Sequence, residues 1–402
     1  MKKHGVALLG FGVVGGGVAD LITANRNEIT AYLGCEVEIR KILDLRDFPD
    51  SPFATLITHD YADILADDGV DTVIEMMGGS HPAYEYTVAA LKSGKNVITS
   101  NKEAVANFGD EFTALANENG VSYRFEAAVG GGIPVINPLL SCIRQNKIRE
   151  VRGILNGTTN YILTKMFTYG DSFENALSDA QAKGYAEANP DADVLGTDAC
   201  RKITILTALA KDKLFDVKSV HTEGITAIRK ADVLAAEKIS HKIKLLGRCI
   251  AEGEKEYVMV APFLIPADSP LAAVNGVYNA VEVVAEPLGN VMFYGQGAGA
   301  GATASAVVGD LLPIISCGNA NPTPPSFNRV DYPASDSFGD FESRKYIAFA
   351  KEYEAKVKEI FTGGEFIESD ECIVITNVES EKKTEEKISA IGASPLSKIR
   401  FL

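Results

Sequence analysis

The sequence predicts an α/β fold: a doubly wound parallel sheet, then an α+β domain, then a small C-terminal α+β module. Over residues 1–130, short apolar runs alternate with helical periods, which is typical of a parallel sheet covered by helices. From Gly130 the glycine density rises and the stretches become longer, which indicates a change of domain. A length of 402 residues also fits two or three cores at about 150 residues per domain.

The first domain is expected over residues 1–129, completed by about 296–320. Its expected strands span 5–9, 37–43, 73–76, 96–99 and 122–126. Its expected helices span 15–30, 81–93 and 110–119, with a returning helix at 303–315. Proline at the second position of the helix 81–93 is a typical start signal.

The second domain is expected over residues 130–295 as a mixture of strands and long helices. Its clearest strands are 151–155 and 257–264, and its clearest helices are 199–211 and 231–246. Residues 321–343 are rich in Pro, Asn, Asp and Ser and are expected to form a linker. The last segment, 344–402, is expected to hold strands at 346–351, 372–376 and 398–402 and helices at 352–362 and 381–391.

The composition is that of a folded globular chain, with 46% hydrophobic and 23% charged residues. The net charge of −15 repels phosphate backbones and anionic lipids, so nucleic acid is a poor partner. The six cysteines form no CxxC pair and lack the close spacing of zinc sites, which fits a reducing, cytoplasmic location. Glycines interrupt both the apolar start and the uncharged stretch 287–309, so neither a signal peptide nor a membrane span is expected.

A GxGxxG motif directly follows the first expected strand and precedes the first expected helix. Its residues are Gly10, Phe11, Gly12, Val13, Val14 and Gly15. The first glycine permits a tight turn, the second lets the backbone approach a pyrophosphate, and the third lets the helix pack closely on the strand. The helix amino terminus then offers free N–H groups to the phosphates. A turn without a ligand is the alternative, but the place between strand and helix favours a dinucleotide.

The end of the second strand selects between cofactors, because an acid there binds the adenosine ribose hydroxyls whereas a base binds a 2′-phosphate. Asp44 favours NAD and Arg46 favours NADP. The next residues add one acid, Asp50, and no base, so NAD is the preferred interpretation. The alternative is that both charges face solvent.

The densest group of ionisable residues lies between positions 184 and 202. Pro190 and Gly196 predict a loop, after which Asp198 and Lys202 lie four apart on one helical face, so that the acid can orient the ammonium. Several carboxylates beside one lysine suit a small substrate that carries its own ammonium group. From these residues alone, a solvated acidic loop with an ordinary ion pair is the more frequent explanation.

A second lysine follows the expected strand 96–99. In a doubly wound sheet the carboxyl ends of the strands line the ligand crevice. Ser100 and Lys102 are therefore expected at the nicotinamide end of the cofactor, together with Met77 and Gly78 from the preceding strand. Taken alone, Lys102 could equally be a surface residue that aids solubility.

Seven motifs in order along the chain resemble those of homoserine dehydrogenases. They read GFGVVGGGV (10–18), VIEMMGG (73–79), NVITSNKEAVA (96–106), EAAVGGGIPVINPL (126–139), RGILNGTTNYILTKM (152–166), GYAEANPDADVLGTDACRKITILT (184–207) and GQGAGAGATASAVVGDLL (295–312). Seven ordered matches of this length make coincidence implausible, and they reverse the interpretation of the acidic loop. The resemblance implies a Rossmann-type nucleotide-binding domain followed by a domain for substrate binding and dimerisation.

The resemblance implies interconversion of aspartate 4-semialdehyde and homoserine by hydride transfer with NAD or NADP, in threonine and methionine biosynthesis. It assigns proton donation to Lys202, assistance at the same oxygen to Lys102, and positioning to Asp198. The residues implied for substrate binding are Glu187, Asp193, Tyr185, Gly184, Asn156 and Thr158. This agrees with the chemistry, because a hydride that arrives at an aldehyde carbon leaves charge on oxygen, for which a positioned ammonium is a suitable partner.

The resemblance implies four further features. A sodium ion is expected near the domain junction, held mostly by backbone carbonyls of Glu126, Val129, Gly131 and Ile133. Gly297 belongs to a segment that returns to the cofactor. A homodimer or homotetramer is expected. The tail resembles a truncated ACT-type module, for which an amino-acid effector such as threonine and a simple packing or dimerisation role are the alternatives.

Two other functions are compatible with a nucleotide-binding scaffold. A non-catalytic NAD-binding sensor would keep the glycine turn and lose an acid or lysine, and none is lost here. Another Rossmann dehydrogenase that acts on an amino-acid aldehyde is the rival enzyme. The segment ILNGTTNYI at 154–162 argues against it.

Overall fold

The computed structural model describes residues 2–253, 255–317 and 327–402. The chain divides into two compact units. Unit 1 comprises Met1–Lys147, Thr204–Leu214 and Gly295–Val330, and unit 2 comprises Ile148–Ile203, Phe215–Tyr294 and Asp331–Leu402. Positions 321–326 of the predicted linker and 318–320 of the segment predicted to complete the first domain lie outside the described residues.

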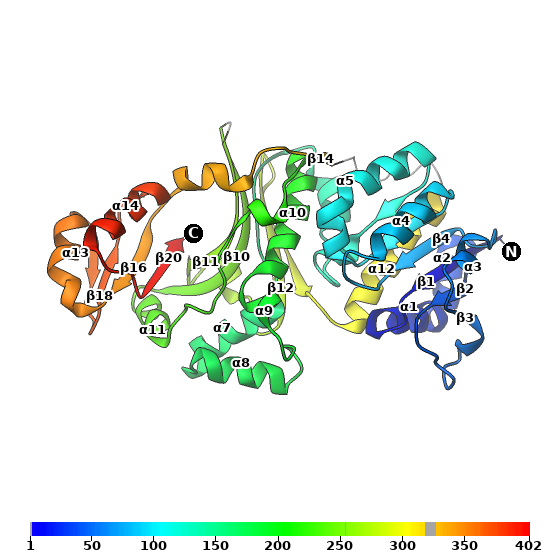
Figure 1. Ribbon diagram of the computed structural model, residues 1–402, viewed down its shortest axis with the longest axis horizontal. Coiled ribbons are helices and arrows are strands. Elements are labelled where there is room, and N and C mark those ends of the chain that lie inside the picture. The colour runs from blue at the N-terminus through cyan, green and yellow to red at the C-terminus, as the bar shows by residue number, and fades with distance from the viewer. Residues whose placement is uncertain (1, 254, 318–326) are drawn as a thin grey trace. The chain divides into compact units, whose positions relative to one another are not determined.

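Unit 1 is built on a six-stranded parallel sheet with the order β3-β2-β1-β4-β5-β6 (Figure 1). The strands are β1 (Lys2–Leu9), β2 (Cys35–Leu43), β3 (Ile57–Thr58), β4 (Thr72–Glu75), β5 (Asn96–Thr99) and β6 (Tyr123–Arg124). The five predicted strands are present. The sequence analysis missed β3, because two residues are too few for a visible pattern.

Helices cover both faces of this sheet, as a doubly wound fold requires. They are α1 (Val13–Ala24), α2 (Arg26–Leu33), α3 (Ala62–Leu65), α4 (Ala83–Lys92), α5 (Lys102–Asn119), α6 (Ile136–Pro138) and α12 (Ala300–Cys317). The single helix predicted over 15–30 is two helices, because the backbone leaves the helical region at Asn25. The helix predicted over 110–119 already begins at Lys102, where the side chain of Asn101 accepts a hydrogen bond from the amide of Ala104.

Smaller elements complete unit 1. They are the short helices Ala54–Leu56, Glu126–Ala128 and Leu139–Ile143, and the parallel pair β8 (Lys213–Leu214) and β14 (Asn328–Arg329). Helix α12 is long and apolar enough to cross a membrane by length and composition. Within unit 1, however, Val307, Leu311 and Ile314 of this helix pack in the same core as Val6 and Leu8 of β1.

Unit 2 is built on a ten-stranded mixed sheet with the order β13-β12-β7-β10-β11-β20-β16-β18-β17, and β9 pairs with β11 (Figure 1). The strands are β7 (Lys147–Ile154), β9 (His221–Thr222), β10 (His241–Glu252), β11 (Lys255–Pro266), β12 (Tyr278–Glu286), β13 (Gly289–Gln296), β16 (Lys345–Phe349), β17 (Glu365–Ile367), β18 (Cys372–Ile375) and β20 (Ser397–Phe401). A separate antiparallel pair joins β15 (Glu342–Ser343) and β19 (Glu379–Ser380).

The helices of unit 2 precede or follow these strands. They are α7 (Gly157–Tyr169), α8 (Phe173–Ala182), α9 (Asp191–Val194), α10 (Thr197–Lys211), α11 (Lys230–Lys238), α13 (Glu354–Ile360) and α14 (Glu381–Ile391), with short turns at Val217–Ser219, Pro270–Ala273, Ala334–Asp340 and Lys351–Tyr353. Helix α10 continues past Ile203 into unit 1.

The predicted helix over 231–246 is wrong in its second half. Helix α11 ends at Lys238, Ser240 takes a left-handed conformation with φ 56°, and β10 begins at His241. Strand β10 pairs with β7 on one side and β11 on the other, and its residues from Ile243 to Ile250 are buried. An apolar run that is buried on both faces has no period-two alternation, so the sequence could not separate it from a helix.

The tail of the chain has one more strand than the sequence analysis counted between its two helices. The order of elements is β16, α13, β17, β18, α14 and β20, and the order in the sheet is β20-β16-β18-β17 with antiparallel neighbours. This is the ferredoxin-like βαββαβ arrangement. Strand β20 also pairs in parallel with β11, so the strands of the tail continue the large sheet of unit 2 (Figure 1).

Candidate active site

The glycine motif forms a strand, a tight turn and a helix, as predicted. Strand β1 ends at Leu9, Gly10 has φ +93°, and α1 begins at Val13. A Cβ on Gly15 would lie 2.0 Å from the carbonyl oxygen of Gly10, so close packing requires this glycine. A Cβ on Gly12 would meet no protein atom nearer than the guanidinium of Arg46 at 4.0 Å. The structure therefore leaves space at Gly12 that protein packing does not need.

The amino terminus of α1 has the character of a phosphate site. The N-cap residue is Gly12, which has no side chain to cap the helix, so the first N–H groups of α1 can bind a ligand. Phe11 packs edge-on against Phe48 and Phe53, and Val13 is exposed beside the turn. A helix amino terminus without a capping side chain, where a glycine lets the ligand come close to the backbone, fits the pyrophosphate of a dinucleotide.

Asp44 and Arg46, the residues that bear on cofactor choice, form an ion pair with each other. The guanidinium of Arg46 donates to both carboxylate oxygens of Asp44 at 3.0 Å, and the amide of Phe11 donates to Asp44 at 2.8 Å. Hydrogen bonding to Arg46 lowers the pKa of Asp44 to about 2. The acid is thus anchored to the glycine turn, and the base stands mostly in solvent beside it.

The predicted nicotinamide end is formed by two loops at the carboxyl ends of β4 and β5. Gly78 has φ +86°, a conformation that glycine adopts without strain. Ser100 binds the carbonyl of Glu75 through its amide, and Lys102 is the first residue of α5. Gly297 lies in the segment before α12, where its carbonyl oxygen is 2.4 Å from a Cβ built on Gly131.

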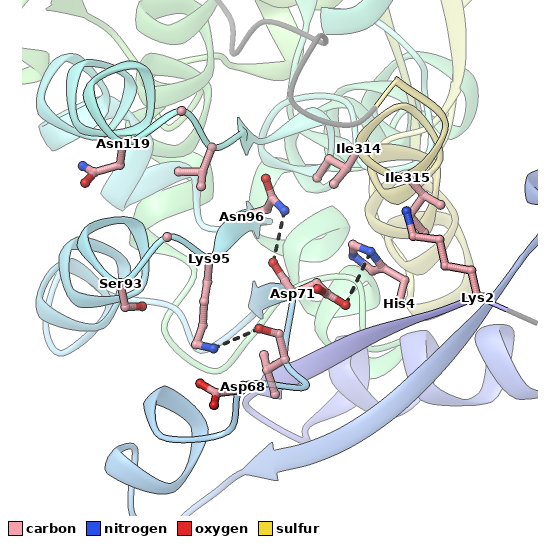
Figure 2. A pocket seen from close by; sticks show the side chains of 14 residues that line it. Lys2, His4, Asp68, Asp71, Ser93, Lys95, Asn96, Asn119, Ile314 and Ile315 are labelled. Carbon is pink, nitrogen blue, oxygen red and sulfur yellow. Dashed lines mark hydrogen bonds and ion pairs between the residues drawn. The ribbon is translucent and has the colours of Figure 1, made fainter.

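A cavity of about 450 Å³ lies at the opposite edge of the same sheet, at the amino ends of its strands (Figure 2). Its polar side chains are already used to fix those strand ends. His4 bonds Thr72 at 2.8 Å, Lys95 donates to the carbonyl of Val70 at 2.9 Å, and Asn96 donates to the carbonyl of Asp71 at 3.1 Å. Because ligands of doubly wound sheets bind at the carboxyl ends, this cavity is not the cofactor site.

In unit 2, one asparagine brings together two of the predicted carboxylates. The amide nitrogen of Asn156 donates to Asp193 at 2.7 Å and to Asp198 at 2.9 Å, while its oxygen accepts from the amide of Thr159 and caps α7. Asp193 lies in the four-residue helix α9, and Asp198 lies in the first turn of α10. The hydrogen bonds of Asn156 therefore connect the acidic loop to α10. The acidic loop is therefore an ordered cluster.

Lys202 is held inside this cluster. Its ammonium donates to Asp198 at 2.8 Å and to the carbonyl of Leu155 at 2.7 Å. Lys202 and Asp198 are only 7% and 4% exposed, which excludes an ordinary solvated ion pair. A buried, oriented ammonium next to a carboxylate can deliver a proton to an oxygen that gains charge.

The other predicted substrate residues lie on the rim of the cluster. The hydroxyl of Thr158 donates to the carbonyl of Tyr185 at 2.6 Å, and the exposed ring of Tyr185 packs edge-on against Tyr161. Gly184 has φ +74° at the end of the preceding turn. Glu187 is exposed, and its backbone carbonyl accepts from Gln181 at 3.1 Å. In unit 2 the structure thus joins Asn156, Asp193, Asp198 and Lys202 directly and leaves Glu187 at the surface.

The predicted sodium loop is buried. The carboxylate of Glu126 accepts from three consecutive amides, those of Val135, Ile136 and Asn137, at 2.6–2.8 Å. It is therefore committed to the protein. By contrast, no hydrogen bond from the described residues reaches the carbonyls predicted as ligands at Val129, Gly131 and Ile133. Buried carbonyls without donors fit a hard cation.

Two family models match most of the chain. The model described as "Homoserine dehydrogenase, NAD binding domain" matches residues 10–126, and the model described as "Homoserine dehydrogenase" matches residues 134–312. The chain belongs to the homoserine dehydrogenase family. It is an NAD(P)-dependent oxidoreductase that interconverts aspartate 4-semialdehyde and homoserine, a step of threonine and methionine biosynthesis. The alternative of a non-catalytic sensor has no support.

Individual homoserine dehydrogenases agree with this assignment. The Bacillus subtilis enzyme is 41% identical over 320 residues, which cover 78% of this chain and 73% of that protein. The Pseudomonas aeruginosa enzyme is 40% identical over 333 residues, 83% of this chain and 76% of that one. The crystal structure of a Thiobacillus denitrificans homoserine dehydrogenase superimposes with a TM-score of 0.90 at 34% identity, covering 100% of this chain and 99% of that one.

A further solved homoserine dehydrogenase, a hyperthermophilic archaeal mutant, is in complex with NADPH. It superimposes with a TM-score of 0.66 at 26% identity, covering 77% of this chain and 97% of that one. The Thiobacillus denitrificans structure, by contrast, covers the whole of this chain, so the fold of the tail also occurs in another homoserine dehydrogenase.

Sequence analysis missed four contributors to these sites. The carbonyl of Leu155 is invisible to any side-chain motif. Asn101 precedes α5 and could have been found as a capping residue, whereas Glu75 lay inside the strand expected over 73–76. Thr99 and Asn101 bind Glu75 from positions 24 and 26 residues away, a distance in sequence that no local pattern spans.

The glycine turn yields a paired prediction. Gly15→Ala places a Cβ 2.0 Å from a carbonyl oxygen and is expected to cost about 1–3 kcal/mol of stability. Gly12→Ala has room in the protein and is expected to keep the melting temperature of the parent while weakening NAD(P)H binding at least tenfold. Thermal melts and cofactor fluorescence titrations of the two variants check this. Equal cofactor affinity of Gly12→Ala and the parent would contradict the pyrophosphate assignment.

Proposed function

We propose that Lys202 carries the proton in the homoserine dehydrogenase reaction. A bound nicotinamide would supply the hydride for C4 of the semialdehyde, or accept the hydride of homoserine in the reverse direction. In the reducing direction the carbonyl oxygen gains a proton as the carbon gains the hydride, and the Lys202 ammonium donates that proton. Its hydrogen bonds to Asp198 and to the carbonyl of Leu155 support this role because they fix the Nζ position before substrate arrives.

The carboxylates hold the amino-acid part of the substrate. Asp193 carries a negative charge at the edge of the cluster, and Glu187 adds a second one from the exposed part of the same loop. Both suit the ammonium group of homoserine. The other residues predicted to bind the substrate line the site beside these carboxylates; they are Asn156, Thr158, Tyr185 and Gly184. Lys102 is proposed to assist at the reacting oxygen.

Replacement of Lys202 tests the central role. Lys202→Met is expected to lower kcat by about 10²–10⁴-fold, because the proton donor is lost, while the dissociation constant for NAD(P)H stays within twofold. Lys218→Met, at an exposed lysine of unit 2, is the matched control and should behave like the parent. A Lys202→Met enzyme that is folded and retains kcat within tenfold would remove Lys202 from the mechanism.

We propose NAD as the preferred cofactor and Asp44 as the residue that selects it. Asp44 directly follows β2, and its carboxylate accepts a hydrogen bond from the amide of Phe11 in the glycine turn. Its lowered pKa keeps the carboxylate ionised at pH values well below neutral. An acid in this place accepts the ribose hydroxyls and repels a 2′-phosphate. Arg46 is the residue that would instead favour NADP, and one structural relative is in complex with NADPH.

The two residues give opposite predictions. Asp44→Ala is expected to lower the ratio of kcat/KM with NAD to kcat/KM with NADP by at least tenfold, because it removes the ribose acceptor and the repulsion of the phosphate. Arg46→Ala should raise that ratio. Steady-state kinetics with both cofactors in parallel provide the measurement, and a ratio that neither substitution changes would refute the assignment.

We propose a sodium ion at the buried loop of Glu126, Val129, Gly131 and Ile133. The carbonyl oxygens of Val129, Gly131 and Ile133 support it: they belong to buried residues and accept no hydrogen bond from the part of the chain that the structure describes. The carboxylate of Glu126 caps the next turn and would act through its carbonyl only. Sodium there would fix the loop that Gly297 touches rather than take part in the reaction.

We also propose a cytoplasmic homodimer or homotetramer. The exposed side chains of Tyr278, Met292 and Tyr294 on β12 and β13 support an interface, and the two tyrosine rings stack at 5.2 Å. Strand β13 is the edge of the large sheet, where an unpaired strand invites a second chain. The free cysteines fit a reducing compartment.

We propose that the tail is an ACT-like module that binds an amino acid such as threonine. Its βαββαβ order supports the comparison. A chain of contacts supports the coupling: buried Arg400 of β20 binds Glu223 through two hydrogen bonds of 2.8 Å, and Ile225 donates to the carbonyl of Val194 at 2.8 Å. Val194 directly follows Asp193 in the chain, so a shift of β20 would displace the acidic loop through these contacts.

Threonine should therefore inhibit the full-length enzyme, with activity falling by more than half at saturation because the acidic loop is displaced. Glycine at the same concentration is the control for ionic and non-specific effects. Initial rates of homoserine oxidation over a threonine titration provide the measurement. A flat titration would leave the tail a packing or dimerisation element.

A further inference from the structure

A buried carboxylate stands at the carboxyl end of β4, in unit 1, and neither the cofactor assignment nor the proton transfer uses it. Glu75 is 1% exposed. One of its oxygens accepts from the hydroxyl of Thr99 at 2.6 Å, and the other accepts from the amide of Met77 at 2.8 Å and from the side chain of Asn101 at 3.4 Å. The carboxylate thus receives donors from both loops that form the predicted nicotinamide end.

The same contacts continue beyond Glu75. The hydroxyl of Thr99 accepts from the amide of Asn101 at 2.9 Å. The side chain of Asn101 then donates to the carbonyl of Gly79 at 2.7 Å and accepts from the amide of Ala104 at 3.1 Å. One network therefore sets the backbone of the Met77–Gly79 loop and the start of α5, whose first residue is Lys102.

The oxygens of Glu75 accept from these loops, and no hydrogen bond joins them to the phenol of Tyr123 among the described residues. The phenol oxygen of Tyr123 is buried and has no hydrogen-bond partner among residues 2–253, 255–317 and 327–402. Burial and the nearby Glu75 carboxylate raise the pKa of this phenol. Glu75 nevertheless turns its oxygens toward Thr99 and Met77.

A carboxylate in this position is costly for stability. Burial raises the pKa of Glu75, which reports a desolvation penalty that its hydrogen-bond donors only partly offset. An apolar residue at the end of a buried strand would avoid that penalty, as replacements of buried charges by apolar groups generally do. Buried ionisable groups with perturbed pKa values, at the sheet edge where ligands bind, are typical of functional sites.

We propose that Glu75 is a positioning residue for hydride transfer, acting through Thr99 and Asn101 on the two loops at the nicotinamide end. It touches neither substrate nor the reacting atoms. The network holds the Met77–Gly79 loop and the first turn of α5 in one arrangement, so that the ring and Lys102 meet the substrate correctly. This inference rests on the proposed place of the cofactor and of Lys102.

The side chain of Thr99 allows an isosteric test. Thr99→Val keeps the shape but removes the hydroxyl, which leaves Glu75 without one donor and the amide of Asn101 without its acceptor. The rate of hydride transfer in a single turnover, followed by nicotinamide absorbance, is expected to fall at least tenfold, with the KM for homoserine within twofold of the parent. Thr99→Ser restores the hydroxyl and is expected to restore the rate to within threefold.

Glu75→Gln provides the second variant and should show the same loss of rate, whereas Glu118→Gln on the exposed face of α5 should show none. Melting temperatures identify variants that lose stability alone. A parent-like rate in Glu75→Gln would overturn the proposal, and so would a rate loss in Thr99→Val that Thr99→Ser does not rescue. Failure of both variants to fold would overturn it as well, since the network would then be structural.

Lys102→Met, measured in parallel, separates this inference from the proposed function. If Lys102→Met keeps the parent rate while Glu75→Gln loses it, the role of Lys102 is wrong and Glu75 acts on the nicotinamide loop. If Lys102→Met loses the rate and Glu75→Gln keeps it, the proposed function stands and the positioning role of Glu75 is refuted.

Discussion

The buried ion pair between Lys202 and Asp198 is the interaction on which the substrate side of this enzyme depends. An ammonium and a carboxylate that are each less than a tenth exposed have lost most of their hydration. Their mutual attraction repays that loss only when further hydrogen bonds complete the site. The carbonyl of Leu155 and the amide of Asn156 supply those bonds. The same bonds leave the ammonium with a fixed position, which is what proton transfer to a developing alkoxide requires.

The sheet of unit 2 explains why Leu155 is in place to accept from Lys202. Leu155 directly follows β7, which pairs with β10. A Cβ on Gly247 of β10 would lie 2.8 Å from the side chain of Leu155 and 3.0 Å from Ile203 of α10, so this glycine lets strand and helix approach closely. From β10, buried Lys244 bonds Asn160 of α7 at 2.9 Å and the carbonyl of Val274 at 2.5 Å. Helix α7 and its cap at Asn156 are thereby fixed to the sheet.

Much of the fold and the location of the site follow from local patterns. The glycine turn was readable because strand, turn and helix are adjacent in sequence, and Asp198 and Lys202 because helical spacing joins them. Strand β10 was not readable, because Lys244 and Arg248 lie four apart in an apolar run, as on a helix. In the structure Lys244 bonds Asn160 of α7, and Arg248 bonds Glu150 of the neighbouring strand β7. The carbonyl of Leu155 likewise becomes a hydrogen-bond acceptor for Lys202 only because folding brings together segments that are 47 residues apart.

The most direct test of this account is a crystal structure of the enzyme with homoserine and the oxidised cofactor bound. The account predicts the hydroxyl oxygen of homoserine about 3 Å from Nζ of Lys202, with Asp198 still bound to that ammonium. A homoserine hydroxyl that is held by other groups, with Lys202 bound only to Asp198 and Leu155 and directed away from the ligand, would contradict it.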